Sequence, residues 1–171
     1  MTTTHPTVDE ARVADTPDLW FTVPGKPEPL RRHRTGTVGG HARAYDDPRN
    51  GPYADRIRWA WREAGGISLG DAPVILVVRA VFARPATHWT SRGVLSKQGH
   101  RTPYNTSKKN GDTSNIIKAV EDALNGYAWD DDSQIIGYAG SHKTYTQTPD
   151  EPARLEVRAR ALRTDVDWMG P

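Results

Sequence analysis

The chain has 171 residues, enough for one domain with a hydrophobic core, and its lack of cysteine excludes disulfides and thiolate metal sites. No apolar run approaches the roughly 20 residues of a membrane-spanning helix, and no secretory signal opens the sequence. With a net charge of only +2, overall charge indicates no particular partner. We therefore expect a cytoplasmic protein without membrane contact.

The N-terminal part predicts a leader, a strand and an arm. Residues 1–17 are polar, with two prolines, and predict a disordered leader. Residues 19–23 (Leu-Trp-Phe-Thr-Val) favour a strand that ends at the Pro24-Gly25 turn. Residues 25–51 are rich in Gly, Pro and Arg, and we expect either a long hairpin, turning at 37–40, or a mobile arm.

The middle of the chain predicts a helix, a strand and a long loop. Tyr53, Ile57 and Trp61 recur at helical spacing, so a helix is expected over 52–64. The β-branched run 74–82 predicts a central strand buried on both faces. Residues 84–111 are polar and lack a clear period, which predicts a long loop of the kind that carries function.

The C-terminal part predicts one more helix and two strands. Residues 115–125 carry one apolar stripe, with Asp112 or Ser114 as the helix cap and Gly126 after its end. Strands are expected over 134–145 and 154–162, before a loose tail at 163–171. The order predicts an α+β fold: a small mixed β-sheet with helices packed on one face, forming a single domain over 18–162.

Charge is unevenly distributed along the second half of the chain. Residues 84–118 contain seven Lys or Arg and one acidic residue, whereas residues 119–134 contain five Asp or Glu and no Lys or Arg. Basic side chains can neutralise phosphates and carboxylates can gather a divalent cation, as a nuclease requires. The alternative is two solvated surface segments of opposite sign.

Asp112, Lys118 and the run 130–132 are the candidate chemical residues. A helix followed by an adjacent strand brings its flanks together, so the carboxylates could converge on a divalent cation. Lys118 would then stabilise charge on the phosphoryl oxygens. Each residue alone also has an ordinary explanation: Asp112 as a helix cap, Lys118 as a solvated lysine or a partner of Asp122, and the run 130–132 as a surface turn.

Four short segments stand at a fixed spacing: Asp112-Thr113-Ser114-Asn115, Lys118, Asp122-Ala123-Leu124 and Asp131-Asp132-Ser133-Gln134. Together they resemble the core pattern of the RusA family of Holliday junction resolvases, in its phage type. That pattern is Asp-x-Asp-Asn, a lysine three residues on, Asp-Ala-Leu, a short turn and Asp-Asp-x-Gln. A weaker likeness extends over about residues 19–162.

The resemblance implies a homodimeric α+β endonuclease that cuts four-way DNA junctions with Mg²⁺, or with Mn²⁺. It implies Asp112 and Asp132 as metal-binding catalytic carboxylates and Lys118 as the catalytic lysine. Ser114 departs from the pattern, because the family has a second aspartate there. Ser114 could bind metal through a water, Asp131 or Asp122 could compensate, or the protein could bind junctions without cutting them well.

Basic side chains outside the motif are candidates for phosphate contact, which positions DNA without reading its sequence. The expected DNA-binding residues are Arg31, Arg32, Arg34, Lys108, Lys109 and Asn115. Further basic residues of the 84–111 loop, Arg92, Lys97 and Arg101, could join them. A homodimer is expected, since a four-way junction has near two-fold symmetry and needs two cuts. The alternative function is a non-catalytic junction-binding protein with a weakened metal site.

Overall fold

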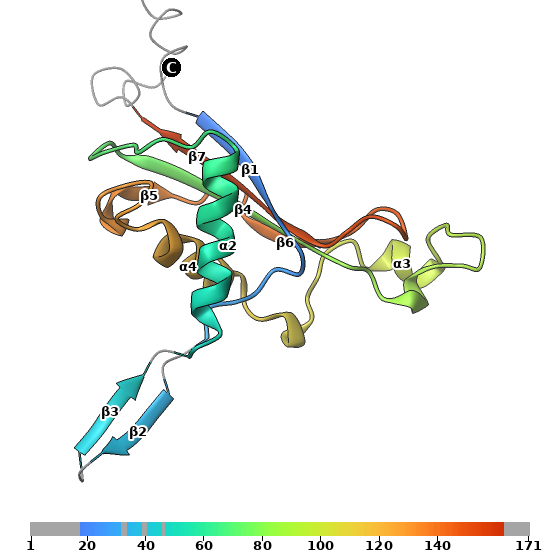
Figure 1. The fold of residues 1–171 in the computed structure, drawn as a ribbon. Helices are drawn as coiled ribbons and strands as arrows, with labels where there is room; N and C mark the ends of the chain where they lie inside the picture. The colour runs from blue at the N-terminus through green and yellow to red at the C-terminus, as the bar shows by residue number, and fades with distance from the viewer. Residues whose placement is uncertain (1–17, 32–33, 39–40, 46, 163–171) are drawn as a thin grey trace, which may run out of the picture.

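A computed structural model describes residues 18–31, 34–38, 41–45 and 47–162 of the chain (Figure 1). The predicted leader 1–17 and tail 163–171 lie outside the described residues. The elements are β1 (Asp18–Pro24), β2 (Arg34–Val38), β3 (His41–Tyr45), α2 (Asn50–Glu63), β4 (Val74–Phe82), η1 (Ala86–His88), α3 (Lys97–Arg101), η2 (Lys108–Asn110), α4 (Thr113–Leu124), η3 (Asp132–Gln134), β5 (Ile135–Gly137), β6 (His142–Tyr145) and β7 (Arg154–Ala161). None of the helices in these ranges is long and apolar enough to cross a membrane.

Five strands form one mixed sheet. β7 pairs in antiparallel fashion with β1 on one side and with β4 on the other. The second edge of β4 pairs with two short parallel strands, β5 near its start and β6 near its end. Since α4 lies between β4 and β5 in the chain, it forms the crossover that a parallel pair requires.

The two long helices pack on one face of this sheet, where Figure 1 shows α2 and α4 side by side. The contact is apolar: Ile57 of α2, Leu76 of β4 and Val120 of α4 are fully buried. The Phe21 and Trp61 rings meet edge to face at 5.6 Å, which joins β1 to α2. Burying side chains of this size contributes about 1.5–3 kcal/mol each. The predicted α+β fold, a mixed sheet with helices on one face, is confirmed.

The prediction that β4 is buried on both faces is wrong. Its residues alternate between buried and half-buried from Val74 to Ala80, because the helices cover only one face. The half-buried positions include Arg79, which pairs with Glu156 of β7 at 3.1 Å. A continuous β-branched run satisfies strand propensity on both faces, so it does not reveal which face the helices leave uncovered.

Two further segments differ from the sequence prediction. The expected strand over 134–145 is two strands, separated by a turn in which Gly140 has a φ of +82°. The expected loop over 84–111 contains three short helical elements, with α3 at its centre. Of the two alternatives for 25–51, the hairpin is present as β2 and β3, in register from Arg34–Tyr45 to Val38–His41. Residues 39–40 of its predicted turn lie outside the described residues.

Candidate nuclease site on helix α4

Helix α4 places the first half of the candidate motif. It begins two residues earlier than predicted, at Thr113, and Asp112 occupies its N-cap position. The Asp112 side chain is exposed and makes no capping hydrogen bond, although its carbonyl accepts from the Ile116 N–H at 3.2 Å. Within the described part of the chain the Asp112 carboxylate thus has no bonded partner and is open to a ligand.

The chain just before α4 is held by close packing and by one lysine. Gly111 has a φ of +71°, and a Cβ there would lie 2.5 Å from the Pro29 side chain. Lys143 of β6 donates to the Gly111 carbonyl at 2.6 Å. The Leu30 N–H donates to the Asn115 carbonyl at 2.8 Å. Backbone and sheet contacts thus fix the position of Asp112 while its carboxylate stays exposed.

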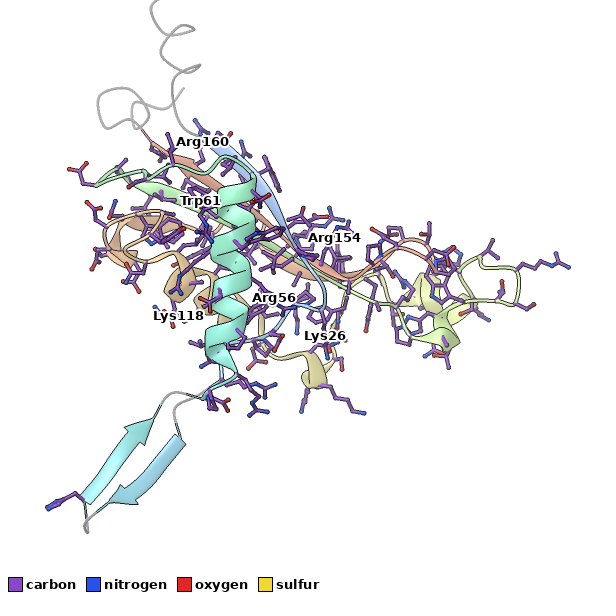
Figure 2. All side chains as sticks on the ribbon, in the orientation of Figure 1. Lys26, Arg56, Trp61, Lys118, Arg154 and Arg160 are labelled. Carbon is purple, nitrogen blue, oxygen red and sulfur yellow. The ribbon has the colours of Figure 1, made fainter. Side chains whose placement is uncertain are left out.

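Lys118 lies at the centre of a charged cluster, which we call the Lys118 cluster. Its Nζ is 2.7 Å from Asp132 Oδ2, 3.1 Å from Asp122 Oδ1 and 3.6 Å from Glu121 Oε2. Figure 2 shows Lys118 on α4, away from Arg154 on the sheet. The hydrogen bond to Asp132 is the main reason why the pKa of Lys118 lies above its ordinary value. Lys118 is therefore a stable cation at neutral pH.

Glu121 and Tyr138 complete this cluster, and the sequence predicted neither of them. The Tyr138 hydroxyl, from the turn after β5, donates to Glu121 Oε1. Glu121 is only 7% exposed, whereas the other carboxylates of the cluster are well exposed. Burial, reinforced by the bond to Glu121, raises the pKa of Tyr138 to about 12. The position of Glu121, three residues after Lys118, was a sequence signal for the contact between these two side chains. The sequence contained no comparable signal for Tyr138.

An open hollow adjoins the cluster. It is lined by Ser114, Asn115, Ile117, Lys118, Glu121 and Tyr138, and its volume is about 440 Å³. Ser114, Lys118 and Glu121 share one face of α4 because they are spaced by four and three residues. Ser114, which stands where the family pattern has an aspartate, is exposed at the start of this face.

The acidic turn divides into a structural aspartate and a cluster aspartate. Asp131 caps η3: its Oδ1 accepts from the Ser133 N–H at 2.8 Å, and its own N–H donates to Gln134 Oε1 at 2.8 Å. Gln134 also donates to the Gly70 and Ala72 carbonyls, at 2.8 and 2.9 Å. Asp131 and Gln134 thereby fix the turn that presents Asp132 to Lys118.

The two carboxylates predicted to share a metal have different surroundings. Asp132 bonds Lys118, but no hydrogen bond or ion pair joins Asp112 to either residue in the described part of the chain. Within the same described ranges, no three Asp, Glu or His side chains are arranged to hold a metal ion. The chemistry of the donors still suits Mg²⁺, which takes one or two carboxylates and completes its shell with water and phosphate oxygens.

The predicted DNA-binding residues fall in different places. Lys108 and Lys109 are exposed on η2, and the half-buried Asn115 borders the hollow. Arg31 is exposed at the base of the hairpin. Arg32 and the side chain of Arg34 lie outside what the structure describes.

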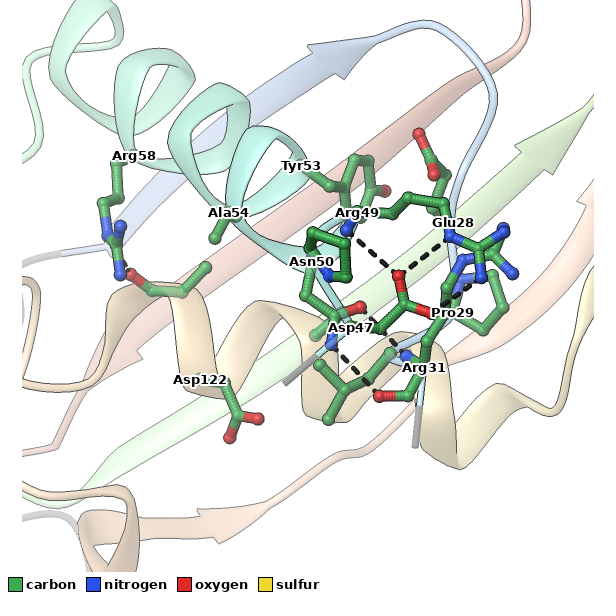
Figure 3. A pocket seen from close by; sticks show the side chains of 15 residues that line it. Glu28, Pro29, Arg31, Asp47, Arg49, Asn50, Tyr53, Ala54, Arg58 and Asp122 are labelled. Atoms are coloured by element: carbon green, nitrogen blue, oxygen red, sulfur yellow. Dashed lines mark hydrogen bonds and ion pairs between the residues drawn. The ribbon is translucent and has the colours of Figure 1, made fainter. Parts of the chain in front are cut away.

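A second pocket, of about 380 Å³, lies between α2, α4 and the base of the hairpin (Figure 3). Arg49 binds the buried Asp47 through two nitrogens, at 2.8 and 2.6 Å. Asn50 exchanges two hydrogen bonds with the Arg31 backbone, at 3.0 and 3.1 Å. These contacts tie both ends of the hairpin to the start of α2, so we assign this pocket an anchoring role.

Comparison with known proteins identifies the family of the chain. The family described as "Endodeoxyribonuclease RusA" matches residues 24–160, which is most of the chain and includes every element from the Pro24 turn to β7. No curated protein was found to match the chain. The matched range contains Asp112, Lys118 and Asp132. The chain belongs to the RusA family of endodeoxyribonucleases.

Proposed function

We propose that this protein is a metal-dependent endonuclease that resolves four-way DNA junctions by phosphodiester hydrolysis. The observation that carries the proposal is the 2.7 Å contact between Lys118 and Asp132. These residues belong to two motif segments, and the contact brings both segments to the hollow on α4. Family membership supports the substrate class.

Lys118 would act as the electrostatic catalyst. Its ammonium is held charged by three carboxylates, and its side chain is 43% exposed, so a phosphate oxygen can approach it. A cation already positioned before reaction stabilises the negative charge that develops on a phosphoryl group. Tyr138 would help to hold the lysine in place through its hydrogen bond to Glu121, which contacts Lys118.

Asp112 and Asp132 would be the carboxylate ligands of Mg²⁺ or Mn²⁺, with Ser114 binding through a water. When bound, such an ion would lower the pKa of a water and stabilise the leaving oxygen. Asp132 would then divide its two oxygens between the ion and Lys118. Asp131 is a weaker candidate ligand, since its side chain already caps η3.

A homodimer would place two such sites on one junction, which suits paired, symmetric cuts. The test is cleavage of a four-way junction in Mg²⁺, in Mn²⁺ and with a chelator, by the wild-type protein and Asp112→Asn. Paired symmetric nicks that need the ion and disappear in Asp112→Asn are expected. Equal affinity for junction and plain duplex, without cleavage, would contradict the proposal.

Ser114 favours a second candidate function, a junction-binding protein that does not cut. A neutral hydroxyl is a weaker ligand for Mg²⁺ than the carboxylate that the family pattern has there. Tight and selective junction binding without nicks in either metal is the result expected from this alternative. The same assay therefore separates the two functions.

A further inference from the structure

The segment 84–105, here called the α3 lobe, has a defined internal structure. At its base Arg84 is 7% exposed, and its Nη1 donates to the Gly99 and Thr102 carbonyls at 3.0 and 3.1 Å. The same guanidinium lies over the Trp89 and Tyr145 rings, at 5.8 and 5.1 Å from their centres. A cation used in this way holds the lobe on the sheet and is not available to a ligand.

The other basic side chains of the lobe are exposed. Arg92 lies in the turn before α3, and Lys97 and Arg101, four residues apart, share one face of α3. No acidic residue occurs between Arg84 and Gly111. None of these three cations makes an ion pair with any described residue.

Three arginines elsewhere, one on α2 and two on β7, are arranged differently. Arg56 pairs with Glu28 at 2.7 Å, Arg158 with Asp18 at 2.5 Å, and Arg154 with Glu151 at 2.6 Å. These guanidiniums are neutralised by the protein itself. Among residues 18–31, 34–38, 41–45 and 47–162, none neutralises the charge of the lobe in this way, so the lobe attracts an external anion.

The lobe is joined to the candidate site by more positive charge. After α3 the chain runs back to α4, as Figure 1 shows, and passes through Lys108 and Lys109 on η2 before it reaches Asp112. Along this stretch Tyr104 is 61% exposed. A line of exposed cations that leads to the proposed nuclease site is suited to neutralising successive phosphates of a DNA strand.

We infer that the α3 lobe binds the phosphate backbone of a duplex arm of the DNA substrate, at a distance from the crossover. The inference rests on the proposed function for the identity of the substrate. Contacts of this kind position the duplex without reading its sequence. Arg92, Lys97 and Arg101 would each neutralise one phosphate, while the residues on α4 bind at the crossover.

The test compares junctions with long arms, about two helical turns each, and short arms of about half a turn. The variant is Arg92→Ala/Lys97→Ala/Arg101→Ala. Its matched control, Arg56→Ala/Arg62→Ala/Arg158→Ala, removes the same charge from α2 and β7. The lobe variant should bind the long-armed junction at least about tenfold more weakly than the wild type. The slope of log binding constant against log salt concentration should be shallower by about three, one for each lost phosphate contact. The lobe variant should bind the short-armed junction like the wild type.

Three outcomes would overturn the inference: equal losses on both junctions, no loss on either, or the same loss in the control. The charge-preserving variant Arg92→Lys/Lys97→Arg/Arg101→Lys should keep wild-type affinity, and failure of this rescue would also count against a phosphate contact. Plain duplex DNA separates this inference from the proposed function. If the wild type neither prefers nor cleaves junctions, the proposed function fails, and weaker duplex binding by the lobe variant alone still supports the lobe as a duplex-binding surface.

Discussion

The Lys118 cluster on α4 and the Asp47–Arg49 pair at the start of α2 both join an arginine or lysine to carboxylates, but their charges are balanced differently. The carboxylate of Asp47 is 4% exposed and is bound by the Arg49 guanidinium through two hydrogen bonds. In the Lys118 cluster one ammonium serves three carboxylates, and two of these are about 40% exposed. Asp47 is thus a buried acid whose charge is balanced by Arg49. The Lys118 cluster is open to solvent and has excess negative charge.

The difference separates a structural role from a chemical one. Removing the partner of a buried charge is costly, so Asp47 and Arg49 are suited to holding the hairpin. Carboxylates that outnumber the nearby cations repel one another, which costs stability but attracts a metal ion. Four substitutions can break or sharpen this contrast, and their effects should decrease in the order given.

Lys118→Ala should have the largest effect. Loss of a preorganised cation at the reacting phosphate should lower the rate of junction cleavage about 10²- to 10³-fold. The free energy of unfolding should change by about 1 kcal/mol or less, because Lys118 is partly exposed and surface ion pairs contribute little. Single-turnover cleavage and urea denaturation measure the two quantities. A parallel loss of both would mean that the cluster is structural.

Asp47→Ala should show the opposite pattern. It removes a buried acceptor and leaves Arg49 without its partner, so the free energy of unfolding should fall by about 1–3 kcal/mol. Chemical denaturation measures this loss, and Asp55→Ala, which removes an exposed acid from α2, is the matched control. If Asp47→Ala is as stable as this control, the anchoring role of the pair is wrong.

Ser114→Asp tests whether the site lacks a carboxylate. If it does, the substitution should raise Mg²⁺-dependent cleavage about tenfold, since carboxylates bind this ion better than hydroxyls. Thr113→Asp is the control, because it adds the same charge to the first turn of α4 and so the same interaction with the helix dipole. Equal cleavage rates in the two variants would show that position 114 has no special role.

Tyr138→Phe should have the smallest effect. It removes the hydrogen bond to Glu121 and so loosens the hold on Lys118, for a loss of about three- to tenfold in kcat. KM should stay unchanged, because Tyr138 acts through Lys118 and not on the DNA. Steady-state kinetics separates the two constants, and Tyr127→Phe, at another exposed tyrosine, is the control. A rise in KM with constant kcat would instead indicate that Tyr138 contacts the substrate.

The sequence by itself predicted the elements with a regular period. The stripe on α4 and the alternation in β7 depend on neighbours within a few residues, so their spacing is enough to identify them. The sequence also identified the motif segments around Asp112, Lys118 and Asp132, because a specific pattern of residue types and spacings can be detected without knowledge of the fold. The RusA family match confirms the resemblance that these segments carried.

Tertiary structure decided which of those residues meet. Lys118 contacts Asp132 because Asp131, Gln134 and the Gly70 carbonyl fix the turn that presents Asp132. Tyr138 joins the cluster because the turn after β5 brings its hydroxyl against Glu121. Such contacts join segments far apart in the chain, and local periodicity contains no information about them. For the same reason, only the fold separates the paired cations of the sheet from the unpaired cations of the α3 lobe.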